Sequence, residues 1–314
     1  MNQPMTILKL VRRYLAQKRA MGYALRFYDG PLIDFARTMD RSTPGQPITV
    51  QAACRWATAI RAAPTYHARR LSLVRNFARF CLDYDPRTEV PPDGLLGPSP
   101  QRIRPHIYSK AQLGTLLHNA RRLKPAFSPL RPLTYETLVG LLAVTGLRRS
   151  EVIRLRLEDF DAQAGTLRVA RSKFAPERLL PLHPSTVKAL ARYLEQRRLF
   201  QPFGQHLFVG HRGQPIAPGS LEQTFRLLVR GVVSTGARPR PRIHDLRHSF
   251  ATRLIATWHR KALPLAHRLL LLSRYMGHRH FHDTWWYISS DPSSLQLAAK
   301  QFHRFRYGRN QIER

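Results

Sequence analysis

Hydrophobic side chains recur every three or four positions through residues 1–87, the spacing that places them on one face of a helix. The pattern begins within the opening ten residues and returns around Leu32 and Phe35. It continues over Val50–Ala62 and again over Thr65–Leu82. We therefore expect residues 1–87 to fold as a helical domain.

The segment Thr65–Leu82 is the most informative of these helices because it is also rich in arginine. Its hydrophobic side chains share one face, and its arginines are expected to point in other directions. These are Arg69, Arg70, Arg75 and Arg79. Such a row fits either a solvated helix face or a DNA-binding strip along a phosphate backbone, and the helix alone does not decide between them.

A segment rich in proline and glycine, residues 88–106, follows the helical region. Proline lacks a backbone N–H and glycine loses much conformational entropy on folding, so this composition resists both helix and strand. We expect a linker here, followed by a second domain over residues 107–314.

After residue 106 the pattern mixes helices with two short β-like runs. Thr166–Ala170 and Arg178–Pro181 flank the polar loop Arg171–Glu177, which predicts an antiparallel hairpin. The expected helices are Ser109–Ala120, Thr134–Val144, Pro184–Arg198, Ile243–Trp258, Leu269–Met276 and Pro292–Phe302. The predicted fold class is mainly α with a small antiparallel β-sheet, of the α+β type, in the second domain.

The charge of the chain points to a polyanionic partner. Its 52 Lys+Arg against 19 Asp+Glu give a formal net charge of +33 over 314 residues, far beyond what solubility needs. Of the basic residues, 17 precede Pro105, against 7 acidic ones, so both halves are basic. The hydrophobic fraction of 43% is sufficient for packed cores, which argues against a disordered basic tail protein.

Cysteine content and the N-terminal pattern indicate a cytoplasmic protein. Cys54 and Cys81 are too few for a disulfide framework or a four-cysteine zinc site, and we expect free thiols in a reducing compartment. Charges at Lys9 and Arg12 interrupt the first hydrophobic stretch, unlike a signal peptide. No apolar run approaches the roughly 18–20 residues of a membrane span. We therefore expect no membrane partner.

Candidate chemistry gathers first around two arginine-containing motifs. In Thr145–Glu151, Gly146 is expected to end one helix and Ser150 to cap the next. Arg148 would then lie beside a helix N-terminus, an arrangement that suits phosphate binding. His244 and Arg247, three apart on one predicted helix, project from the same side, although such a pair also fits plain solvent exposure.

Two further features lie later in the chain. Lys173 is expected at the tip of the hairpin, where a lysine can give up a proton that an arginine cannot, although hairpin tips often carry solvated lysines. Tyr287 follows Gly277-His278 by nine residues, behind two tryptophans, a setting in which a tyrosine usually packs. His278 alternates with two more histidines, but no carboxylate or cysteine stands at ligand spacing, so we expect no metal.

In this order, the motifs together resemble the tyrosine recombinase (phage integrase) family over about residues 107–300. The most specific is His-x-x-Arg-His, followed about 30 residues later by Gly-His and then by a tyrosine. The helical first domain looks like the core-binding domain of that family. The resemblance implies a catalytic set of Arg148, Lys173, His244, Arg247, His278 and Tyr287. The hairpin departs from the family's common Gly-Lys-Gly turn, because Ser-Lys-Phe-Ala-Pro stands there instead.

The resemblance implies a site-specific recombinase, or integrase, that acts on double-stranded DNA through a covalent 3′-phosphotyrosine at Tyr287, without metal, cofactor or ATP. It also implies a two-domain, C-shaped clamp that works at the nucleoid as a homo-tetramer or with related recombinases. Two alternatives remain at this point. One is an accessory DNA-binding protein of a mobile element that leaves its site unused, and the other is a type IB topoisomerase-like enzyme with a similar residue set.

Overall fold

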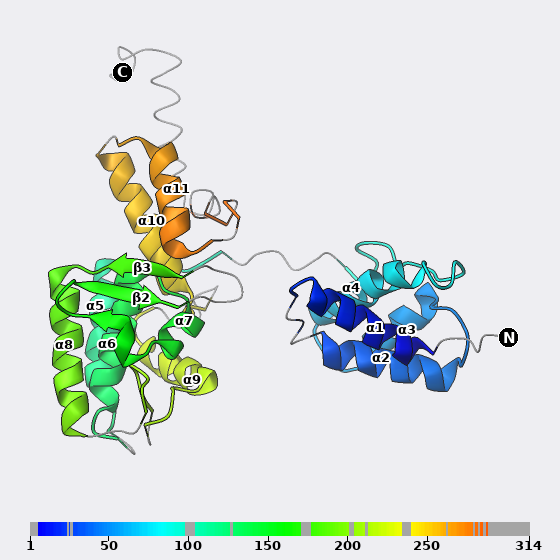
Figure 1. Cartoon of the computed structure of the whole chain (residues 1–314), viewed down its shortest axis with the longest axis horizontal. Coiled ribbons are helices and arrows are strands. Elements are labelled where there is room, and N and C mark those ends of the chain that lie inside the picture. Colours follow the sequence, from blue (N-terminus) through cyan, green and yellow to red (C-terminus); the bar gives the residue numbers. More distant parts are fainter. Residues whose placement is uncertain are drawn as a thin grey trace, which may run out of the picture. The chain divides into compact units, whose positions relative to one another are not determined.

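The computed structural model divides into two compact units, Met1–Arg102 and Ile103–Arg314 (Figure 1). The structure describes residues 6–23, 25, 28–97, 104–125, 128–170, 177–200, 204–210, 213–233, 240–261, 263–278, 280–281, 283–284 and 287. The division between the units falls inside the segment expected to be a linker.

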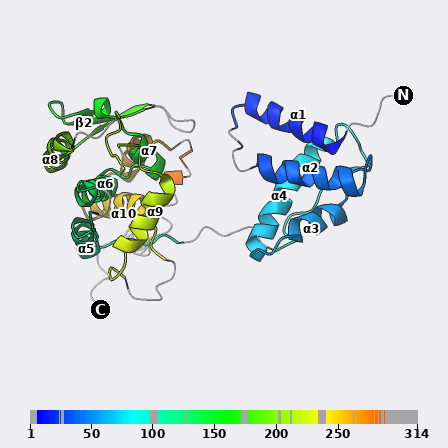
Figure 2. The ribbon, with the colours of Figure 1, turned by 90° about the horizontal axis from the view of Figure 1, so that it is seen from below.

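The first unit is built from helices, as expected. They are α1 (Ile7–Ala20), α2 (Asp29–Ser42), α3 (Val50–Thr58) and α4 (Pro64–Cys81), seen together in Figures 1 and 2. The Thr6 and Thr49 side chains cap α1 and α3 by accepting from backbone N–H groups. The expected helix Val50–Ala62 is too long, because α3 ends at Thr58 and α4 begins at Pro64.

The apolar faces of these four helices meet in one core. No surface is exposed on Leu32 and Phe35 of α2 or on Val74 and Phe77 of α4. The members of each pair are three positions apart, which is the helical spacing that the sequence predicts. Cys81, a free thiol, is buried at the edge of this core.

Residues 88–97 belong to the first unit rather than to a linker. The Glu89 N–H donates to the Ile48 carbonyl at 2.8 Å, and Val90 packs against the core of the helices. The expected linker of residues 88–106 therefore begins too early, because proline and glycine prevent helix formation but do not prevent packing.

Along the sequence of the second unit, helices both precede and follow the three strands of a small sheet. Its elements are α5 (Lys110–Arg121), α6 (Arg131–Thr145), α7 (Arg149–Arg154), η1 (Leu157–Asp159), β1 (Phe160–Asp161), β2 (Thr166–Val169), β3 (Arg178–Pro181), α8 (Pro184–Leu199), α9 (Pro218–Leu228), α10 (Asp245–Arg260) and α11 (Leu265–Met276). The sheet has the order β1-β2-β3 and is antiparallel throughout. The predicted fold class is confirmed.

The predicted hairpin is confirmed by β2 and β3, which pair with Leu167 opposite Leu180. Its tip and the expected helix Pro292–Phe302 lie outside the described residues. The prediction omitted β1 and α9. The sequence does indicate the helix α9. Pro218 stands in its first turn, and the buried residues Leu221, Phe225 and Leu228 follow at helical spacing.

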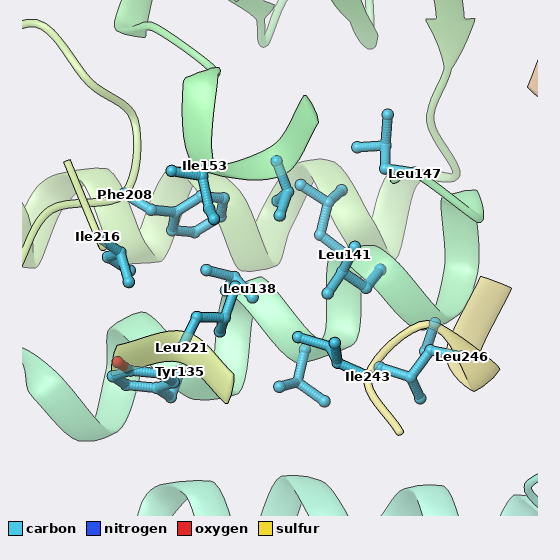
Figure 3. Close-up of a cluster of buried hydrophobic side chains, with 14 of the residues drawn as sticks. Tyr135, Leu138, Leu141, Leu147, Ile153, Phe208, Ile216, Leu221, Ile243 and Leu246 are labelled. Atoms are coloured by element: carbon cyan, nitrogen blue, oxygen red, sulfur yellow. The ribbon is translucent and has the colours of Figure 1, made fainter. Parts of the chain in front are cut away.

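The core of the second unit forms around α6, which packs against α5, α8 and α10. Figure 3 shows Leu138 and Leu141 of α6 facing Ile153 of α7, Leu221 of α9 and Leu246 of α10. Elements far apart in the sequence are thereby held around one helix, whose C-terminal end leads into the Thr145–Glu151 motif.

Candidate active site

Two helices that end in glycine form the base of the site. Gly146 closes α6 and Gly277 closes α11, both in the left-handed conformation, with φ of 63° and 65°. At Gly146 a Cβ would lie 2.6 Å from the Phe250 ring, so both the backbone angle and the space require glycine there. Such helix ends carry carbonyl groups that lack partners within the helix and a partial negative charge.

The two arginines of the predicted set occupy these helix ends. Arg247 donates through Nη1 to the Gly146 carbonyl at 2.6 Å and through Nη2 to the Met276 carbonyl at 2.8 Å. Arg148 donates through Nη2 to the Gly277 carbonyl at 2.6 Å. Arg247 is only 2% exposed, and burial lowers its pKa. It stays charged, because a guanidinium group is not deprotonated in proteins.

Arg148 is also fixed by the helix that it precedes. The expected cap at Ser150 is wrong, because α7 already begins at Arg149 and Arg148 itself is the N-cap residue. The Glu151 carboxylate takes the capping role, accepting the Arg148 backbone N–H at 2.8 Å and its Nη1 at 2.9 Å. An acidic side chain in the first helical turn could have indicated this role from the sequence.

Glu151 joins the arginine turn to the base of the hairpin. Its carboxylate accepts two hydrogen bonds from Arg178 of β3, at 2.9 and 3.2 Å, and Arg178 also donates to the Tyr275 carbonyl at 2.8 Å. Burial alone would raise the pKa of Glu151, but Arg178 and Arg148 together hold that pKa below its usual value. Neither residue is in the predicted set, although both position members of it.

Both predicted histidines lie close enough to these arginines for the positive charge to lower their pKa values. His244 precedes α10 and is exposed, yet surrounding protein atoms and Arg247 lower its pKa to about 4. His278 follows Gly277 and is partly buried, and burial together with Arg247 and Arg148 lowers its pKa to about 3.

Tyr287 completes the group. Its side chain is 3% exposed, and its hydroxyl lies 3.4 Å from Nε2 of His278, whose Nδ1 is 2.6 Å from the Thr284 hydroxyl. The Tyr287 ring stacks on His278 at 5.7 Å between centroids and meets His248 edge to face at 5.1 Å. The structure thus brings together five of the six predicted residues. The sixth, Lys173, lies outside the described residues.

The α4 arginines separate into two pairs. Arg70 and Arg75 are buried, so their expected direction away from the apolar face is wrong. Arg70 lies 3.8 Å over the Trp56 ring and donates to the Trp56 carbonyl, because its long side chain reaches from α4 across to the last turn of α3. Arg69 and Arg79 are exposed, and their contact with DNA stays a prediction.

Within the described residues, no cluster of three or more His, Cys, Asp or Glu side chains is placed to hold a metal ion. In the same part of the chain, no helix combines the length and the hydrophobicity that crossing a bilayer demands.

The sequence profile of the phage integrase family matches residues 108–294, which contain every member of the predicted set. The chain belongs to this family. A protein of Sinorhizobium fredii described as an integrase/recombinase, y4rB, is 38% identical over 95% of this chain and 98% of its own length. The tyrosine recombinase XerC of Actinobacillus succinogenes is 27% identical over 75% of this chain and 74% of its own length. Integrase-family membership makes the protein a tyrosine-type, site-specific DNA recombinase.

Solved structures of integrase-family proteins share the fold. The Tn1549 transposon integrase in complex with transposon right end DNA has a TM-score of 0.69, with 17% identity over 96% of this chain and 100% of that one. The XerH recombinase in a post-cleavage complex with its palindromic difH substrate has a TM-score of 0.64, with 17% identity over 88% of this chain and 79% of that one.

Proposed function

We propose that this recombinase cleaves and rejoins DNA strands through a covalent 3′-phosphotyrosine intermediate, with neither metal nor ATP. The observation that carries the proposal is the Tyr287 hydroxyl, 3.4 Å from Nε2 of His278 and beside the guanidinium group of Arg247, which in turn lies near Arg148. The structural relatives bound to DNA support duplex DNA as the substrate.

In the cleavage step, the Tyr287 oxygen attacks a backbone phosphorus. The new O–P bond forms as the bond to the 5′ oxygen breaks, which leaves a 3′-phosphotyrosine and a free 5′ hydroxyl. Attack by a 5′ hydroxyl of another strand reverses the step and conserves the bond energy, so strand exchange needs no ATP.

His278 is the acceptor of the tyrosine proton. An ordinary tyrosine has a pKa of about 10, so only about one in a thousand is ionised at pH 7 and a nearby base lowers the barrier. With its own proton on Nδ1, His278 donates to Thr284 and leaves Nε2 as the acceptor. Its lowered pKa keeps the ring neutral, and thus able to accept, at pH 7.

The two arginines stabilise the charge that develops on the phosphate. Each guanidinium has five N–H donors, of which two bind the protein acceptors described above. We propose that donors beyond these bind the non-bridging oxygens, and the loss of one such preorganised donor group costs about 10²–10³ in rate. This fixed positive charge serves the role that a metal ion has in other phosphoryl transfer enzymes. His244 hydrogen-bonds the phosphate, and the resemblance assigns protonation of the 5′ oxygen to Lys173.

The charge distribution supports binding by both units, as in a clamp around the duplex. Both halves of the chain are basic, and Arg69 and Arg79 give the first unit exposed cations on α4. Exchange between two duplexes requires more than one protomer, and we propose four, acting on DNA inside the cell. Because such binding releases many counterions, its affinity should fall steeply with salt, and a nearly flat log–log salt slope would contradict the clamp.

The decisive experiment uses nicked duplexes from the DNA that flanks the gene. A nick a few nucleotides 3′ of the cleavage position lets the short fragment that carries the free 5′ hydroxyl diffuse away, so the strand cannot be rejoined and the covalent adduct accumulates. Protein and DNA are incubated without divalent metal, and the products are separated under denaturing conditions. We expect a shifted band with the wild type and none with Tyr287→Phe, because only the hydroxyl is removed.

Binding shifts measured on the same duplexes interpret the result. Specific binding without an adduct would contradict the proposal and favour an accessory DNA-binding protein. Relaxation of a supercoiled plasmid without strand exchange would favour a topoisomerase-like enzyme.

A further inference from the structure

His248 is the member of the His-x-x-Arg-His motif that the proposed chemistry leaves unused. It follows Arg247 on α10 and is half-buried. Its ring centroid lies 5.0 Å from that of His244 and 5.1 Å from that of Tyr287, and both pairs are close to edge-to-face. His248 therefore contacts both His244 and Tyr287, the proposed nucleophile.

The Tyr287 ring is held from two directions. His278 stacks on it with an interplanar angle of 25°, whereas His248 meets it at 64°. Edge-to-face and offset stacked aromatic pairs are both favourable, and two such contacts at different angles restrict the two side-chain torsions of a tyrosine. The 3% exposure of Tyr287 shows how closely it is enclosed.

The backbone on both sides of His248 is fixed. Arg247 is bound to two helix ends through the Gly146 and Met276 carbonyls. Ser249 donates to the Asp245 carbonyl at 2.7 Å and accepts the Tyr108 N–H at 2.8 Å, which ties α10 to the start of the second unit. His248 is thus a side chain on a rigid support, which is the property that a positioning residue needs.

We propose that His248 is a positioning residue that holds the Tyr287 ring so that its hydroxyl stays beside His278 and Arg247. The inference rests on the proposed function, in which Tyr287 attacks phosphorus. His248 contacts the rings of Tyr287 and His244, while the Tyr287 hydroxyl lies beside Nε2 of His278. The flat ring of His248, rather than its ability to exchange protons, is the property used.

Three variants test this role: His248→Phe keeps a flat ring, His248→Leu removes it, and His267→Leu is the control. His267 is an exposed histidine of α11. The full-length proteins are compared for duplex affinity, adduct formation at saturating DNA and thermal stability. Because a misplacement of about 1 Å can cost about 10²-fold in rate, His248→Leu should slow adduct formation about 10- to 100-fold with little change in affinity. His248→Phe should recover most of that loss, with a pH–rate profile of wild-type shape.

A second readout needs no DNA. In protein with ring-labelled tyrosine, the NMR signal of Tyr287 is identified by its loss in Tyr287→Phe. It should shift or broaden in His248→Leu and stay unchanged in His267→Leu. If the wild type forms no adduct, the proposed function fails and this signal alone decides the inference, so the two failures are distinguishable.

Four results would overturn the inference. His248→Leu with wild-type rate and an unchanged Tyr287 signal would show that the ring contact does not matter. His248→Phe as slow as His248→Leu would mean that a ring nitrogen is required. An altered pH profile in His248→Phe would make His248 a titrating group of the reaction. Equal loss of affinity in both His248 variants would make its role structural.

Discussion

Buried arginines in the two units are anchored alike but differ in what surrounds them. Arg75 of the first unit donates to the Pro91 and Pro92 carbonyls, both at 2.7 Å, just as Arg247 of the second donates to Gly146 and Met276. Burial against carbonyl groups is therefore a way to fix a guanidinium in either unit, and by itself it indicates no function.

The difference lies in the neighbouring charges. Arg75 forms an ion pair with Asp93, which compensates its charge. Arg247 lies close enough to Arg148 that the like charge lowers its pKa, and Tyr287 also faces it. The nearby carboxylate of Glu151 already pairs with both Arg148 and Arg178, so positive charge stays in excess. The electrostatic repulsion between two cations held at helix ends decreases when an anion binds between them. A site is thus recognised by convergence of like charges with titratable groups, rather than by the burial of one arginine.

Arg247→Lys should give the largest effect on chemistry. A single ammonium group cannot reach both helix-end carbonyls and also present donors in the fork of a guanidinium. We expect the rate of adduct formation to fall about 10²–10³-fold, the cost of losing one preorganised donor group. Single-turnover kinetics at saturating DNA measure this. Near-wild-type kinetics would mean that the anchoring of Arg247 serves only the fold.

Gly146→Ala tests the helix end that holds Arg247. The residue has φ of 63°, and a Cβ would lie 2.6 Å from Phe250, so the strained backbone and the clash should cost about 1–3 kcal/mol in the free energy of unfolding. Adduct formation should slow as well, because the Gly146 carbonyl moves. Denaturant unfolding and adduct kinetics are the measurements, and a stable variant with unchanged kinetics would contradict this account.

Arg75→Ala should affect stability without affecting chemistry. It leaves the buried Pro91 carbonyl without its donor, which costs about 1–3 kcal/mol in the free energy of unfolding. Once the variant is folded and saturated with DNA, its rate of adduct formation should match the wild type. A rate loss as large as that of Arg247→Lys would erase the contrast between the two buried arginines.

Acid sensitivity should distinguish the second unit. The pKa of His278 is lowered to about 3 in the folded protein, so the unfolded chain binds more protons below its ordinary pKa of about 6.5. Stability should therefore fall as pH drops from about 6.5 towards 3. Thermal unfolding of His278→Gln across this range should show a shallower decline than the wild type, and identical declines would contradict a buried neutral His278.

Arg79→Ala should give the smallest effect. Arg79 is exposed on the same helix as Arg75, so its loss should leave thermal stability unchanged. If it contacts a phosphate, the variant should weaken DNA binding across sequences and reduce the log–log salt slope by about 1. An unchanged slope would assign Arg79 to a solvated helix face. The same test applies to Arg69.

Periodicity predicted most helices and the β2–β3 hairpin, because alternation and helical spacing are local properties of the chain. The motifs that contain Arg148, His244 and Tyr287 came instead from the order and spacing of particular residues and from their resemblance to a family. The start of α7 was placed wrongly because the N-cap residue is Arg148, whose backbone N–H donates to the Glu151 side chain, and Ser150 already lies inside the helix. The Pro/Gly-rich segment was assigned to a linker because composition reports the absence of helix and not the absence of packing.

By itself, the sequence determined that the chain is basic, helical and equipped with a recombinase residue set in a specific order. Only the tertiary structure decided which of its arginines are anchored and what they face. It paired Glu151 with Arg178, turned Arg70 and Arg75 inward, and set His248 against Tyr287. The physical reason is that a hydrogen bond or a ring contact depends on separation in space, and residues 146, 247 and 276 become neighbours only when α6, α10 and α11 pack.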